Sequence, residues 1–194
     1  MDEVRPKFGT KLRLADVVQY RDGLIFALTA FMPMRRKNLA ALDVLEHLQF
    51  DGATDIIVIP KVESKTGVPI EFEVPEILLP YVQDYERFVR ARIDPRNTNT
   101  GLWLSRNGRK LSYGAFYDLF ARHSKRRLGV HVRPHDVRAA AATTWAVFSP
   151  ENIEVAQELL AHKDIRTTAA YNRARGIEAS RHHAKVLKRI RRSR

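Results

Sequence analysis

The sequence contains no cysteine among its 194 residues. Disulfide bonds, thiolate zinc sites and cysteine nucleophiles are therefore excluded together. It also lacks any apolar run near the roughly 20 residues that a membrane-spanning helix needs. With 44% hydrophobic residues, the chain is nevertheless long enough to bury one sizeable core. These absences predict a cytoplasmic protein with no membrane partner and a chemistry that does not depend on thiols.

Acidic residues are scarce relative to basic ones, and the net charge is +12. Residues 181–194 contain seven Lys or Arg and no acid, whereas the first 180 residues hold 27 cationic and 22 acidic side chains. A basic body with a basic tail suits a polyanion, because each neutralised phosphate releases counterions. Nucleic acid is the favoured partner. A tail that only solubilises the protein, or that rests on a membrane surface, is the alternative.

The hydrophobic pattern predicts a mostly helical α+β domain with one small three-stranded antiparallel sheet. Strands are expected near residues 45–50, 55–59 and 70–74, separated by Asp51-Gly52 and Thr66-Gly67 turns. The segment 102–104 is either a short strand or an extended link. Capping and proline signals place helices at 15–31, 35–42, from Pro75 or Pro80 to 93, 112–128, from Pro134, from Ser149-Pro150, from Asp164, and after Gly176.

Two clusters near the C-terminal end have the residue types for phosphate chemistry. Pro134 at the first helical position puts His135 in the first turn, with Arg138 three residues later on the same helical face. An arginine fork can bind two phosphate oxygens and stays charged. By itself this spacing is weak, since a surface helix often carries it.

The second cluster is Leu160-Ala161-His162, followed nine residues later by Tyr171. His162 could equally be a C-terminal histidine interacting with its helix dipole, and Tyr171 a tyrosine packed on the core. A phenol with a pKa near 10 is a poor nucleophile at neutral pH. It becomes plausible only beside positive charges that stabilise the phenolate and the transition state.

Four sequence boxes in order resemble those of the tyrosine recombinases, the phage integrase family. They cover roughly residues 20–175, and their joint occurrence is far more specific than any one of them. The boxes are Pro33-Met34-Arg35-Arg36-Lys37-Asn38-Leu39, Glu63-Ser64-Lys65-Thr66-Gly67, His135-Asp136-Val137-Arg138, and Leu159-Leu160-Ala161-His162 through Thr167-Thr168 to Tyr171.

Two positions depart from the family pattern: Ala161 replaces the usual glycine, and Asn38 replaces an acid that would orient Arg35. Neither change removes a group that the reaction requires. Lys61 competes with Lys65, which the Lys-Thr-Gly turn favours. Within the first box, Arg36 and Lys37 are interpreted as solvated or backbone-contacting charges. The histidines outside the boxes are interpreted as surface or structural residues: His47, His123, His131, His182 and His183.

The resemblance implies a metal-independent reaction with no cofactor. Tyr171 would attack the scissile phosphorus, leaving a 3′-phosphotyrosyl link and a free 5′-hydroxyl. Arg35 and Arg138 would clamp the non-bridging oxygens, and His162 would donate a hydrogen bond to the phosphate. Lys65 would protonate the leaving oxygen, and His135 would handle the proton of Tyr171.

The resemblance also implies a site-specific DNA recombinase or integrase of a mobile element, acting as a tetramer on double-stranded DNA, with room for accessory DNA-bending proteins. We expect a nucleoid-associated protein of bacterial or phage origin.

Residues 1–176 would be the catalytic domain (1–14 a leader). Because only about 20 residues precede the catalytic helix, the family's N-terminal DNA-gripping domain would be absent from this chain. The basic segment 177–194 would either dock on a neighbouring protomer or contact DNA backbone.

Two other functions remain open. A type IB topoisomerase shares the phosphotyrosine chemistry, and a non-catalytic DNA-binding module could keep the same fold. Retention of all six candidate residues argues against the second of these.

Overall fold

The computed structural model describes residues 1–8, 12–50, 55–65, 67–149, 155, 157, 159 and 160. The chain forms two compact parts, Met1–Val137 and Arg138–Arg194, which are described separately. Among the described residues, no helix combines the length and the apolarity that crossing a bilayer requires. Of the helix predicted from Ser149-Pro150, the structure describes Val155, Gln157 and Leu159, and all three are helical. The helices predicted from Asp164 and after Gly176 lie outside the described residues, as do the Asp51-Gly52 turn and Thr66.

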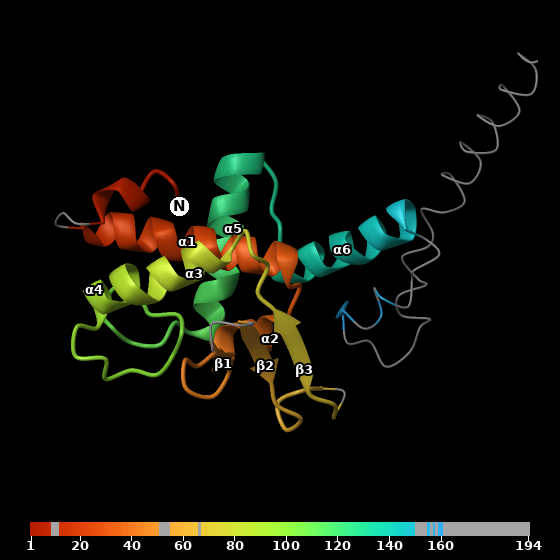
Figure 1. Cartoon of the computed structure of the whole chain (residues 1–194). Helices are drawn as coiled ribbons and strands as arrows, with labels where there is room; N and C mark the ends of the chain where they lie inside the picture. Colours follow the sequence, from red (N-terminus) through yellow and green to blue (C-terminus); the bar gives the residue numbers. More distant parts are fainter. Residues whose placement is uncertain are drawn as a thin grey trace, which may run out of the picture. The chain divides into compact units, whose positions relative to one another are not determined.

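The central helix of the first part is α1 (Leu14–Phe31), close to the predicted 15–31 (Figure 1). The Asp16 carboxylate accepts hydrogen bonds from the Arg13 backbone N–H and side chain, which fixes the start of the helix. Pro33 follows its end. The preceding segment, predicted as a leader, contains a short 3₁₀ turn, η1 (Arg5–Lys7), and Phe8 stacks on Phe88 with ring centroids 4.8 Å apart.

The predicted three-stranded antiparallel sheet is confirmed, with order β1-β2-β3. Its strands are shorter than expected: β1 (Leu48–Gln49), β2 (Ile56–Ile59) and β3 (Ile70–Glu73). Ile57 pairs with Leu48 on one side and Phe72 on the other. Ile57, Ile59 and Phe72 are buried, so one face of the sheet belongs to the core. The short helix α2 (Arg36–Ala41) precedes the sheet.

The helix predicted to end at Ile93 is a continuous helical run in three pieces: α3 (Leu79–Asp84), the π-helical η2 (Tyr85–Arg90) and α4 (Ala91–Ile93). The sequence did not reveal the π segment. Residues 102–104 form no strand; Gly101 and Leu104 make isolated bridges to Asp43 and Lys110. They are held by buried aromatic groups, since the Trp103 indole N–H donates to the Leu39 carbonyl and the Tyr85 hydroxyl donates to the Leu102 carbonyl.

Two further long helices follow, and both begin where the sequence predicted. Helix α5 (Tyr113–Leu128) begins where the Ser112 hydroxyl accepts a hydrogen bond from the Ala115 N–H, and it ends at Gly129, whose φ is 72°. Helix α6 (Pro134–Phe148) begins in the first part and continues into the second (Figure 1). Within the second part, Ala142, Ala146 and Leu160 are buried.

Candidate active site

Arg35 lies at the N-terminal end of α2 in an extended conformation, with φ −63° and ψ 138°. The side chain is half-buried, and this burial lowers the pKa of the guanidinium from its ordinary value. Arginine remains protonated despite such a shift, because its ordinary pKa is so high. The fold therefore holds a partly desolvated cation at this position, where its interaction with an anion is stronger than in bulk water.

Lys65 lies on the connection between β2 and β3, and its side chain is exposed. The neighbouring Ser64 is buried, and its backbone N–H donates to the Pro60 carbonyl at 3.1 Å. Gly67 has a φ of 70°, a left-handed conformation that favours glycine. Lys61 on the same connection is also exposed, so exposure alone does not separate the two lysines.

Two residues outside the predicted catalytic set hold Glu63, which lies two positions before Lys65. The Asn38 side-chain amide on α2 donates to the Glu63 carbonyl at 3.4 Å. The buried His47 accepts from the Asp43 N–H through Nδ1 at 3.1 Å, so its Nε2–H donates to the Glu63 carboxylate at 3.2 Å. The sequence interpretation of His47 as structural is confirmed, and Asn38 connects the helix of Arg35 to the Lys65 connection.

This anchoring predicts that His47→Leu destabilises the protein by about 1–3 kcal/mol, because the Asp43 N–H and the Glu63 carboxylate lose their partner. Urea unfolding measures that loss. We also expect slower DNA cleavage, since the root of the Lys65 connection would be released. His47→Gln is the matched variant, because its amide can still accept and donate, and it should recover part of both quantities. Unchanged unfolding and cleavage in His47→Leu would show that the contact positions nothing.

His135 is exposed in the first turn of α6, as the sequence predicted. The Asp136 carboxylate fixes this helix end: it accepts from the Arg133 backbone N–H at 2.8 Å and from the Arg133 guanidinium at 2.8 and 3.1 Å. These hydrogen bonds lower the pKa of Asp136, so its carboxylate stays ionised near the positive end of the helix dipole. Asp136 was part of the quoted box, but its capping role was not predicted.

A chain of cation–aromatic and aromatic contacts joins α2 to the segment before His135. The Arg36 guanidinium lies 3.9 Å from the ring centroid of Tyr113 and 5.7 Å from that of Tyr117, both on α5. Tyr117 in turn packs against His131, with centroids 5.9 Å apart. Arg35, Lys65 and His135 therefore lie on elements of the first part that are linked through direct contacts. Sequence reasoning missed this role of Arg36; the only signal was a tyrosine pair four residues apart on a predicted helix.

Arg138 belongs to the second part, where its side chain is buried and donates to the Leu160 carbonyl at 2.7 Å. This bond ties α6 to the chain two residues before His162. A buried guanidinium bound at one edge keeps a fixed orientation, which suits the predicted clamp. His162 and Tyr171 themselves lie outside the described residues, as do His182 and His183.

Comparison with known families places these residues in context. Residues 11–176 match the model of the phage integrase family, a stretch that contains all six candidate residues. The chain belongs to the phage integrase family. This confirms the family resemblance on which the sequence prediction rested, and it covers most of the chain rather than a single box.

The curated proteins to which this chain is similar are named tyrosine recombinases. XerC of Pseudomonas entomophila is 31% identical over 156 residues, which is 80% of this chain and 49% of that protein. XerD of Staphylococcus epidermidis is 27% identical over 153 residues, which is 78% of this chain and 50% of that protein. The chain thus spans about half the length of the curated relatives it matches.

Solved structures confirm the α+β fold predicted for this family. The XerH site-specific recombinase bound to palindromic difH substrate, a post-cleavage complex, aligns with TM-score 0.66 at 17% identity, covering 91% of this chain and 49% of that chain. The XerA recombinase aligns with TM-score 0.62 at 17% identity, covering 82% of this chain and 54% of that chain. At this identity the likeness concerns the fold alone.

Proposed function

We propose that this chain is the catalytic domain of a site-specific DNA recombinase. The observation that carries the proposal is the family match over residues 11–176, which encloses six side chains of the types that metal-independent phosphoryl transfer needs. Three of them, Arg35, Lys65 and His135, lie on contacting elements of one compact part. Relatives along this stretch are named tyrosine recombinases.

In the proposed reaction, the Tyr171 hydroxyl loses its proton to His135 and its oxygen attacks the scissile phosphorus. The bond from phosphorus to the 5′-oxygen breaks, and Lys65 supplies the proton that the departing oxygen needs. Negative charge on the non-bridging oxygens is stabilised by Arg35 and Arg138, with His162 as a further donor. A 5′-hydroxyl then attacks the 3′-phosphotyrosyl link and reverses the step, so rejoining needs no ATP.

The proposed substrate is double-stranded DNA, and the proposed biological role is the integration or excision of a mobile element by a tetramer. A net charge of +12 supports a polyanionic substrate. The proposal of DNA as substrate draws on two structures of the same fold, in which XerH is bound to its difH substrate and the Tn1549 transposon integrase is bound to a circular-intermediate DNA. Of these two, the transposon integrase alone belongs to a mobile element by its name.

Trapping the covalent intermediate tests the proposal. A duplex nicked near the cleavage position loses the short 5′-hydroxyl strand after attack, so the enzyme cannot rejoin the DNA and stays attached to it. We expect an adduct that protease digestion reduces to a peptide containing Tyr171, linked to a 3′-phosphate. Relaxation of supercoiled plasmids that lack any recombination site would favour a type IB topoisomerase instead. Absence of adduct with intact DNA binding would indicate a non-catalytic module.

A further inference from the structure

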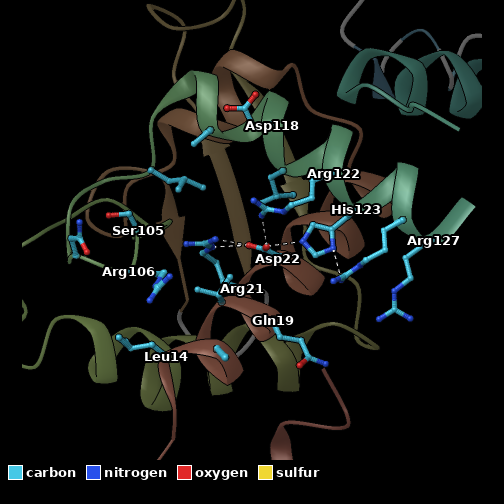
Figure 2. Close-up of a pocket in the computed structure, with 17 residues that line it drawn as sticks. Leu14, Gln19, Arg21, Asp22, Ser105, Arg106, Asp118, Arg122, His123 and Arg127 are labelled. Carbon is cyan, nitrogen blue, oxygen red and sulfur yellow. Dashed lines mark hydrogen bonds and ion pairs between the residues drawn. The ribbon is translucent and has the colours of Figure 1, made fainter. Parts of the chain in front are cut away.

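A groove rich in arginine lies in the first part, away from the residues discussed so far (Figure 2). Its volume is about 1220 Å³, and three elements line it: the N-terminal half of α1, the turn at residues 105–107, and α5. Five arginines and His123 line this arginine groove, against two aspartates, Asp22 and Asp118. The lining is therefore net positive, and the groove is too large for a single small anion.

The floor of the arginine groove is a buried ionic network that ties its three walls together. Arg21 and Asp22 are 5% and 1% exposed. The Arg21 guanidinium donates to Asp22 at 2.6 Å and to the Leu104 carbonyl, at the root of the 105–107 turn, at 2.8 Å. Asp22 also bonds His123 on α5 at 2.8 Å, as Figure 2 shows. Because the Arg21–Asp22 pair on α1 connects to the 105–107 turn through Arg21 and to α5 through Asp22, the groove is preorganised rather than free to collapse.

The two helical walls differ in character. On α1, Leu14 and Val18 are four residues apart, so they form one ridge, and Leu14 is 37% exposed. On α5, Arg122 and Arg126 are likewise four residues apart and both exposed. The arginine groove thus presents a partly exposed apolar ridge facing a basic ridge, and Arg106 on the turn adds another cation.

Within the first part, the arginine groove and the contact of α5 with Arg36 lie on opposite sides of α5. Tyr113 and Arg122 are nine residues apart, which is two and a half helical turns, so their side chains point about 180° apart. Tyr113 contacts Arg36, next to Arg35. A single phosphate held near Arg35 is therefore out of reach of Arg122 and Arg126.

We infer that the arginine groove binds an acidic amphipathic helix of a partner protein. Carboxylates one turn apart on such a helix match the spacing of Arg122 and Arg126, and its apolar side chains cover Leu14 and Val18. Duplex DNA could also bind the arginines, but its backbone offers nothing apolar to cover that ridge. An acidic amphipathic helix would pair with the arginines of α5 and cover the apolar residues of α1, so it accounts for both walls of the groove.

Peptide binding to the intact chain tests this inference. The probe is a fluorescent peptide of about 14 residues with glutamates one turn apart beside a leucine stripe. A peptide of the same composition in shuffled order and a short random-sequence duplex serve as competitors. We expect the amphipathic peptide to bind at least about tenfold more tightly than the shuffled one, a difference that anisotropy titration resolves.

Two double variants with equal change in charge separate the groove from bulk electrostatics. Arg106→Glu/Arg126→Glu should weaken peptide binding at least about tenfold, whereas Arg87→Glu/Arg96→Glu, at exposed positions outside the groove, should not. Leu14→Gln should also weaken it while leaving all charges in place. Three results would overturn the inference. The first is an equal loss of peptide binding in both double variants, and the second is equal affinity for the amphipathic and the shuffled peptide. The third is that duplex DNA displaces the peptide and itself fails to bind Arg106→Glu/Arg126→Glu. None of these results bears on the proposed recombinase function, which covalent attachment of Tyr171 to DNA tests separately.

Discussion

Replacing Tyr171 by phenylalanine is expected to abolish covalent attachment to DNA while leaving DNA affinity nearly unchanged. The substitution removes one oxygen, the proposed nucleophile, and keeps the ring. Phenylalanine offers no oxygen for the attack, so adduct formation should fall by at least about 10³-fold, below detection on a denaturing gel. Binding should persist, since phosphate contacts come from the cationic residues of the chain.

Tyr117→Phe is the matched control for that experiment, because it removes a hydroxyl from a described, exposed tyrosine on α5. It should form adduct at the parent rate. The assignment of Tyr171 would be refuted by a Tyr171→Phe protein that still attaches to DNA, and also by a loss of adduct that merely follows a loss of binding or of the folded state.

Substitution of Lys65 by alanine is expected to slow cleavage by about 10²–10⁴-fold, the range typical of a lost general acid. The exposed side chain makes a folding defect small, so unfolding in urea should stay close to that of the parent. The rate should recover on DNA whose 5′-bridging oxygen is replaced by sulfur. A thiolate leaves without a proton because a thiol has a pKa of about 8.5, far below that of an alcohol.

Lys61→Ala provides the comparison for Lys65, because the two lysines share the β2–β3 connection and are both exposed. It should leave cleavage within about threefold of the parent on both substrates, since a surface charge contributes little. If sulfur substitution rescues Lys61→Ala instead, the general acid is Lys61. If it rescues neither variant, no lysine of this connection protonates the leaving oxygen.

Much of the fold was predictable from the sequence because local signals set it. The ends of α5 follow from the Ser112 cap and from Gly129, and α6 begins at Pro134 as expected. The three-stranded antiparallel sheet was also predicted correctly, since its strands are short apolar-rich runs separated by glycine-containing connections. The π-helical η2 was not predicted, because apolar periodicity and capping signals do not distinguish a π-helical turn from an α-helical one; its Tyr85 and Val89 are buried in the core.

In the candidate site, too, some features follow from the sequence and others only from the tertiary structure. The sequence by itself determined the residue types and their order, since nucleophile, clamp and acid must each be a particular side chain, and with them the family. Only the tertiary structure decided what holds those residues. His47 meets Glu63 across 16 positions, Arg36 meets Tyr113 across 77, and Asp22 meets His123 across 101. Periodicity and capping signals act over a few residues, whereas contacts between residues far apart in the sequence depend on how whole elements pack. The sequence alone therefore could not predict the contacts that anchor the Lys65 connection, or the arginine groove.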